Sequence, residues 1–395
     1  MPSRILFSTF LKDVAYLSVT SFGGPQAHLA HFQKRLVTRR SYLSEAELLE
    51  LNAVCQVLPG PTSTQTLSTV GYKLGGAKLA YLTLLIWILP SLIIMTGTGI
   101  LVASLDAKQI SLTFTRFIQP MAVGFIAYTA YSMGMKTVTT WAGIAIMFAA
   151  AIASYLIKTP FVFPITLCVA GVITAFNYKR HPRQEKKKME IKWANFALWA
   201  GVFILAAVIG GLTKALPVRL FENFYRNGSL IFGGGQVLTP LLFTEFVQYA
   251  PKQYLSAQEF LSGYALAQAV PGPVFSFSSY IGALAMREHG VGGEILGAIM
   301  SAAGIFLPGT FLIFFMIRVW DSLKKFRPIR ASLEGILAAN VGLVVAAAIV
   351  LFQPLPGTLA TYGLTIGTFC LQLFTRLPAW SIILAGLLLG LVLGG

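Results

Sequence analysis

The chain has 395 residues, of which 56% are hydrophobic and only 11% are charged, and its mean hydropathy is +0.72. A soluble domain carries far more charge on its surface, so this composition excludes an ordinary soluble protein and predicts a polytopic membrane protein. The formal net charge is +16, but no nucleic-acid motif accompanies it. Its concentration in short loops between apolar segments is typical of membrane orientation signals rather than of nucleic-acid binding.

The first part of the chain, residues 1–177, is predicted to form one helical repeat. It opens with two segments that glycine and proline interrupt, Arg4–Gln33 and Leu43–Tyr72. Helices are expected because lipid offers no hydrogen-bond partners to the backbone, and no alternating barrel pattern occurs. The apolar windows that follow suit helices in a membrane and are Leu79–Leu105, Leu112–Met135, Ala142–Leu156 and Phe161–Phe176.

A basic loop and one linking helix, residues 178–214, are expected to join this repeat to a second one, residues 215–395. The linking helix is Trp193–Leu212, and the second repeat again opens with two interrupted segments, Pro217–Phe243 and Leu255–Met286. The sequence therefore predicts an all-α polytopic membrane protein. The apolar windows of its second repeat are Ile295–Ile317, Ile336–Phe352, Leu359–Leu373 and Trp380–Leu393.

Two motifs that each occur twice support this duplication. Phe22-Gly23-Gly24-Pro25-Gln26 recurs 210 positions later (22 to 232) as Phe232-Gly233-Gly234-Gly235-Gln236. Gln56-Val57-Leu58-Pro59-Gly60-Pro61 recurs 212 positions later (56 to 268) as Gln268-Ala269-Val270-Pro271-Gly272-Pro273. Internal repeats of this kind are typical of secondary transporters, whose binding sites lie where helices are broken.

The loop charges predict that the two repeats are inverted in the membrane. The basic segment Lys34–Arg40 precedes the first Pro-Gly-Pro motif, whereas Arg318–Arg330 follows the span after the second one. Because basic loops face the cytoplasm, the repeats would have opposite orientations, with the N-terminus and residues 178–192 cytoplasmic. The segments Leu43–Tyr72 and Leu255–Met286 would then be re-entrant helical hairpins. The Phe-Gly-Gly segments are open to both interpretations, hairpin or full span.

Both motifs have the residue types that suit an anion site. Proline starts a helix, glycine lets a ligand approach the backbone, and the first-turn N–H groups lie at the positive end of the helix dipole. Helix breaks needed only for packing would look similar, but their recurrence favours a site. The predicted substrate-binding residues are Gly23, Gly24, Pro25, Gln26, His28, Gln56, Pro59, Gly60, Pro61, Thr62, Ser63, Gly233, Gly234, Gly235, Gln236, Gln268, Pro271, Gly272 and Pro273.

The acidic residues near the motifs have simpler interpretations. Ser44-x-x-Glu47 and Ser256-x-x-Glu259 are capping boxes, which we favour over proton carriers. Glu222 and Arg226 are four apart, as in an ion pair on one helix face, although Arg226 as an anion contact is the alternative. No metal site and no cofactor are expected, since His28 and His31 have no acidic or cysteine partner nearby in the sequence.

The paired motifs resemble those of the chromate ion transporter family, in its long two-domain form, over nearly the whole chain. The resemblance implies a bacterial inner-membrane protein that exports chromate and is not an enzyme. The family often has Gly where Ser18 stands and Trp where Tyr42 stands. It often has Glu where Arg35 stands, and the second repeat keeps that acid as Glu245. Glu245, Arg226 and Arg35 are therefore the candidates for coupling, and Glu245 is expected to be the acid that can serve it.

We interpret the sequence as that of a secondary-active transporter that exports chromate, a divalent tetrahedral oxyanion, by alternating access. An importer or exchanger of sulfate or another oxyanion is an alternative. A membrane-embedded oxidoreductase acting on chromate is an alternative of another class, for which Cys55, beside Gln56, would be the residue to test. The expected partners are the oxyanion and the lipid bilayer, with no nucleic acid, and a homodimer is left open.

Overall fold

The computed structural model is all-α: the described residues form helices and turns and contain no strand. The structure describes the chain except for residues 1–3, 109–111, 178–192, 231–236, 324–325 and 394–395. The prediction of an all-α polytopic membrane protein is confirmed. Four stretches of helix are long and apolar enough to cross a membrane, namely Thr62–Ala107, Ala194–Thr213, Arg287–Ile317 and Arg327–Phe352.

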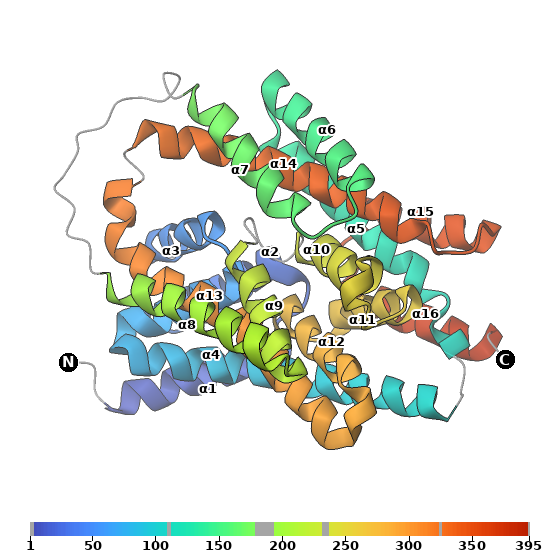
Figure 1. Cartoon of the computed structure of the whole chain (residues 1–395). Coiled ribbons are helices and arrows are strands. Elements are labelled where there is room, and N and C mark those ends of the chain that lie inside the picture. Colours follow the sequence, from blue (N-terminus) through green and yellow to red (C-terminus); the bar gives the residue numbers. More distant parts are fainter. Residues whose placement is uncertain (1–3, 109–111, 178–192, 231–236, 324–325, 394–395) are drawn as a thin grey trace.

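The first half of the chain runs from a long helix through two broken segments into a bundle (Figure 1). A π-helix, η1, continues α2, and the bundle ends with α5, α6 and α7. The elements are α1 (Arg4–Thr20), α2 (Gly24–Phe32), η1 (Gln33–Arg39), α3 (Glu45–Val57), α4 (Thr62–Ala107), η2 (Leu112–Thr115), α5 (Ile118–Thr137), α6 (Trp141–Leu156) and α7 (Val162–Ala175).

The second half repeats this order after the linking helix α8 (Ala194–Thr213). A π-helix, η4, again follows the short helix α10. The elements are α9 (Leu216–Leu230), α10 (Leu238–Phe243), η4 (Thr244–Gln248), η5 (Ala250–Lys252), α11 (Ala257–Ala269), η6 (Val274–Ser276), α12 (Phe277–Ala285), η7 (Arg287–His289), α13 (Gly290–Leu323), α14 (Arg327–Phe352), α15 (Leu359–Phe374) and α16 (Ala379–Leu393).

The hairpin helices α3 and α11 match residue for residue at an offset of 212 (45 to 257 and 57 to 269). Each begins with the capping box that its sequence predicts: Ser44 accepts from the Glu47 N–H and Ser256 from the Glu259 N–H, both at 3.2 Å. The capping residues fix where each helix starts, and the following Pro-Gly-Pro ends it, because proline cannot continue a helix and the glycines at its centre have positive φ.

A glycine ends each hairpin on the other side. Residue Gly76 (φ 71°, ψ −164°) breaks α4, and Gly290 (φ 67°, ψ −174°) separates η7 from α13. Without this break the 46 residues of α4 would extend about 69 Å, more than twice the hydrocarbon thickness of about 30 Å. The segments around the two Pro-Gly-Pro motifs are thus helix–break–helix units, as predicted, each followed by a long apolar helix.

The two halves interlock at the Pro-Gly-Pro tips. A Cβ atom on Gly60 would lie 3.2 Å from the Cα of Gly309, and one on Gly272 would lie 3.2 Å from the Ser91 Oγ. Gly309 and Ser91 follow Pro308 and Pro90 in the long helices α13 and α4, so each tip packs against the long helix of the other half. In Figure 1 the long arm of α4 runs from left to right and α13 from right to left, an antiparallel arrangement that agrees with inverted repeats.

The outer surface is apolar. Large side chains such as Ile93, Phe148 and Ile165 are 58–63% exposed, whereas α14, which packs against α5, α6 and α7, buries most of its small residues. An exposed apolar belt around a buried core is expected where lipid, rather than water, surrounds the helices.

Candidate functional site

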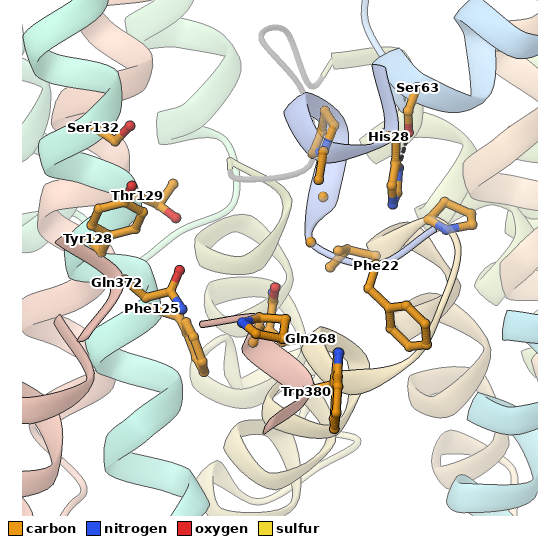
Figure 2. A pocket seen from close by; sticks show the side chains of 18 of the residues that line it. Phe22, His28, Ser63, Phe125, Tyr128, Thr129, Ser132, Gln268, Gln372 and Trp380 are labelled. Carbon is orange, nitrogen blue, oxygen red and sulfur yellow. Dashed lines mark hydrogen bonds between the residues drawn. The ribbon is translucent and has the colours of Figure 1, made fainter. Parts of the chain in front are cut away.

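The first Phe-Gly-Gly motif and parts of both Pro-Gly-Pro motifs meet around one cavity of about 680 Å³. Figure 2 shows it between the first Phe-Gly-Gly segment, helix α5, and the second Pro-Gly-Pro tip. Of the predicted substrate-binding residues, those that line it are Gly23, Gly24, Pro25, His28, Pro61, Thr62, Ser63, Gln268 and Pro273. No carboxylate lies among the described residues that line this cavity, so an anion entering it meets no fixed negative charge.

The start of α2 is built to leave its first turn accessible. Gly23 (φ 93°) and Gly24 (φ 79°) are both in the left-handed region, which glycine adopts without the strain that a Cβ would add. A Cβ on Gly24 would have no neighbouring atom within 4 Å, which means that the backbone there faces open space. Pro25 then sets the first helical turn, whose N–H groups have no partner within the helix and lie at its positive end.

The start of α4 adds hydroxyl groups to the same wall. Thr62 and Ser63 line the cavity, and the Ser63 Oγ lies 3.0 Å from the Nδ1 of His28. This contact, drawn in Figure 2, ties the Phe-Gly-Gly helix to the Pro-Gly-Pro helix. The His28 ring is 1% exposed, and its Nε2 has no hydrogen-bond partner among the described residues.

Other polar groups at this helix start hold the fold together. The Gln65 Nε2 donates to the Pro59 carbonyl (2.7 Å) and to the Gly309 carbonyl of the second half (3.1 Å). The Trp87 indole donates to the Thr64 Oγ1 at 3.1 Å. These bonds fix the Pro-Gly-Pro tip against α13 and α4, so they position the cavity wall rather than line it.

The second half contributes through its own Pro-Gly-Pro tip. Gln268 and Pro273 line the cavity, and the Gly272 N–H donates to the Ser21 carbonyl at 2.9 Å, directly beside the first Phe-Gly-Gly motif. The predicted residues that do not line the cavity are Gln56, Pro59, Gly60, Pro271 and Gly272. The remaining ones, Gly233, Gly234, Gly235 and Gln236, and the side chain of Gln26, lie outside the described part of the structure.

The cavity has walls that the sequence analysis missed. Phe125, Tyr128, Thr129 and Ser132 form one face of α5, Gln372 and Trp380 come from the end of α15 and the start of α16, and Arg376 lies in the connection between them. Polar residues three and four apart in an otherwise apolar helix were the available signal on α5. For Arg376 the signal was a charge between two apolar windows, which an orientation role explained equally well.

The coupling candidate Glu245 lies at the buried centre of an ion-pair network. Its carboxylate is 0% exposed and accepts from Arg226, from the Asn227 Nδ2 at 2.6 Å, and from the Lys252 Nζ at 2.7 Å. Arg226 also makes the predicted helix-face pair with Glu222, at 3.1 Å. Because two cations and an amide surround one carboxylate, η4 is anchored to α9 through Glu245.

The first half has a matching network, but its charges are exchanged. Arg35, at the position that corresponds to Glu245, pairs with Asp13 of α1 at 2.5 Å, and Arg40 pairs with the same carboxylate at 2.9 Å. The Tyr42 hydroxyl donates to Asp13 at 2.8 Å. Asp13 is thus a second buried acid, which the sequence did not indicate, and the role of Glu245 in coupling stays a prediction. Asp13 is also 0% exposed, and at its position the second half has Asn223.

The two capping acids are engaged as predicted and also pair with a cation. The Glu47 carboxylate accepts a hydrogen bond from the Lys73 ammonium. This interaction and the capping box together lower the pKa of Glu47 to about 2. Glu259 bonds Arg287 in the same way. Cys55 is fully buried and does not line the cavity, so the residue named for an oxidoreductase has no access to this site.

Comparison with known proteins identifies the family of this chain. The family described as chromate transporter matches residues 6–176 and 218–391. A probable chromate transport protein of Synechococcus elongatus is 27% identical over 374 residues, 94% of this chain and 88% of that protein. A chromate transport protein of Cupriavidus metallidurans is 26% identical over 98% of this chain and 92% of its own length.

An uncharacterised transporter of Methanocaldococcus jannaschii is also 26% identical, over 88% of this chain and 84% of that protein. No solved structure matches the chain. The family match extends over most of the chain and includes the residues that build both Pro-Gly-Pro tips and the cavity between them. The chain belongs to the chromate transporter family.

Proposed function

We propose that this protein carries chromate, or a closely related divalent tetrahedral oxyanion, across the membrane through the cavity between its two halves. The observation that supports this most directly is the lining of that cavity. Two helix starts, the Ser63 and Thr62 hydroxyls and the Gln268 amide meet there without a carboxylate. These are the donors that a desolvated oxyanion needs, because each of its oxygens accepts hydrogen bonds and its charge favours the positive ends of helices.

Its position between the halves suits an alternating-access mechanism. The walls come from α2 and α4 on one side and from the second Pro-Gly-Pro tip and α16 on the other. In transporters with inverted repeats, one repeat moves against the other around a site at their interface. The hydrogen bond from Gly272 to Ser21 crosses this interface, so a change of access would have to break or slide it.

Export is the direction that the electrical potential favours. An inside-negative potential of 100 mV contributes about 2.3 kcal/mol per charge, which is about 4.6 kcal/mol for an outward-moving dianion. The basic segment Lys34–Arg40 would face the cytoplasm of a bacterial inner membrane, where it attracts anions toward the protein. Import of the same ion would need coupling to protons or other cations, for which Glu245, Arg226 and Arg35 are the candidates.

Chromate accumulation in cells tests the proposal. Cells expressing the protein should accumulate less chromate than cells with the empty vector, and the Gly24→Val variant should lose this difference at equal expression. The matched control is Gly97→Val, since Gly97 lies in α4 away from the cavity, and an added Cβ there would have no neighbouring atom within 4 Å. Equal accumulation with Gly24→Val and the unaltered protein would refute the site. Competition by sulfate, molybdate and phosphate in proteoliposomes would identify the preferred ion.

A further inference from the structure

A second cavity, of about 450 Å³, lies between the end of α1 and the segment formed by α2 and η1. We call it the basic cavity, and its polar lining consists of Tyr16, Thr20, His31, Lys34, Arg35 and Arg39. Three of these six side chains are cationic, and no carboxylate lies among the described residues that line it. Its chemistry is therefore that of a site for a multiply charged anion.

The π-helix brings these cations together. Arg35 and Arg39 are four apart on η1, His31 lies four residues earlier on α2, and all three line the same cavity. Lys34 lies next to Arg35 and reaches the same space. The sequence alone reads as a run of basic residues typical of a loop, whereas the helix arranges part of that run around a cavity.

Most of this positive charge is not neutralised. Arg35 pairs with Asp13 at 2.5 Å, and its guanidinium lies 4.4 Å from the centre of the Tyr16 ring. Lys34 and Arg39 have no acidic partner within 4 Å among the described residues. Lys34 and Arg39 are exposed, and two cations without an acidic partner beside a hollow raise the local concentration of anions there.

The basic cavity adjoins the central one. Thr20 and His31 line both, Thr20 as the last residue of α1 and His31 near the end of α2. An anion held by Lys34 and Arg39 would therefore lie beside the central cavity. The arrangement places a site lined by three cations before one whose described lining contains a single cation of this kind, Arg376.

The second half has no counterpart among its described residues. At the positions that correspond to His31, Lys34, Arg35 and Arg39 it has Leu241, Thr244, Glu245 and Tyr249. Leu241, Thr244 and Glu245 are 0–7% exposed, and the Glu245 network fills the space between η4 and α9. In a protein with inverted repeats, this difference places the anion-attracting cavity on one side of the membrane only.

We propose that the basic cavity is a second oxyanion site, which binds the transported divalent anion at the entrance to the central cavity. This inference rests on the proposed transport function and deepens it, because it identifies where the anion enters. It also gives the transporter a preferred side: loading is fast from the side where Lys34 and Arg39 lie, which the loop charges predict to be the cytoplasm.

Equilibrium dialysis with radiolabelled chromate, on the full chain in nanodiscs of neutral lipid, tests the site directly. We expect two chromate ions per chain for the unaltered protein and one for the Lys34→Gln/Arg39→Gln variant. The matched control, Lys12→Gln/Lys78→Gln, removes the same charge from exposed positions outside both cavities and should still bind two. Equal stoichiometry in the two double variants would overturn the proposal.

Nanodiscs with anionic phospholipid separate a free oxyanion from a lipid headgroup, since both offer the same oxygen ligands. Two chromate ions per chain in these nanodiscs would support a site for free oxyanion. Loss of the second ion only in anionic lipid would show that a headgroup occupies the cavity, and would refute its role in transport.

Transport kinetics then separate this inference from the proposed function. With chromate supplied on the side of the basic cavity, the Lys34→Gln/Arg39→Gln variant should show a KM raised about tenfold, with Vmax within about twofold of the unaltered protein. The rise should shrink at high ionic strength, because salt screens the exposed charges. Normal transport with an unchanged KM would refute the entrance site alone. Absence of transport by the unaltered protein would refute the proposed function itself.

Discussion

The exchanged ion-pair networks predict how the first half responds to changes at its buried carboxylate. Loss of this carboxylate should lower stability, whereas its transfer from α1 to η1 should be tolerated. In the Asp13→Asn variant, Arg35 loses a partner at 2.5 Å while its side chain stays 80% buried. Removing one member of a buried pair costs about 3–5 kcal/mol, and we expect the lower figure because Arg40, 43% exposed, regains water. With an unfolding entropy of about 2.1 cal/mol/K per residue, a loss of about 3 kcal/mol lowers the Tm of 395 residues by about 4 °C.

The compensating change copies the second half, which has Asn223, Arg226 and Glu245 at the corresponding positions. A triple variant, Asp13→Asn/Tyr16→Arg/Arg35→Glu, therefore relocates the carboxylate from α1 to η1 and should regain at least half of the lost Tm. Arg35→Glu alone is the control, because it places two carboxylates together and should be less stable than Asp13→Asn. The assay is thermal unfolding of purified protein in detergent. A triple variant less stable than Asp13→Asn would refute the equivalence of the two networks.

Three further predictions concern the motifs. Gly60→Ala should lower the Tm more than Gly272→Ala. Both glycines have positive φ (113° and 96°), so both alanines would be strained. The added Cβ at position 60 would lie 2.9 Å from the side-chain amide nitrogen of Gln65, whereas the one at position 272 would lie 3.2 Å from the Ser91 hydroxyl. Ser63→Ala removes the contact to His28 and a cavity hydroxyl, and should raise the KM for chromate in proteoliposomes about fivefold, since such a bond contributes about 1 kcal/mol. Ser256→Ala should cost about 1 kcal/mol of stability, seen as a lower Tm, and leave that KM unchanged. A KM change with Ser256→Ala would show that the cap serves the site.

Local sequence patterns were sufficient for the elements that local chemistry determines. The bounds of α3 and α11 follow from capping residues at one end and a Pro-Gly-Pro at the other, and both signals act within a few residues. The glycines were harder to interpret. Gly60 and Gly24 look alike in the sequence, yet Gly60 packs against Gly309 and Gly24 faces the cavity. A glycine permits close approach of either a backbone or a ligand, and only the tertiary structure decides which one comes close.

The walls of the cavity that were missed are those that distant packing supplies. Tyr128 and Ser132 look like ordinary polar residues of an apolar helix until α5 is placed beside the Phe-Gly-Gly segment (Figure 2). Asp13 was missed for a different reason. Comparing the repeats position by position shows Asp13 against Asn223 and Arg35 against Glu245 as two unrelated mismatches. They are one exchange, and this becomes visible only when α1 and η1 are in contact.

This exchange indicates what the duplicated fold requires at these places. If a carboxylate at the position of Glu245 were needed for its own chemistry in each half, the first half could not have Arg35 there. The two halves share the same kind of cluster, which has one fully buried carboxylate and two basic side chains. In the first half this cluster joins the π-helix η1 to α1, and in the second half it joins η4 to α9. The cluster therefore anchors the π-helix in both halves. The sign of the charge on the π-helix is free to differ, and in the first half it adds a cation to the lining of the basic cavity, where we propose that the anion enters.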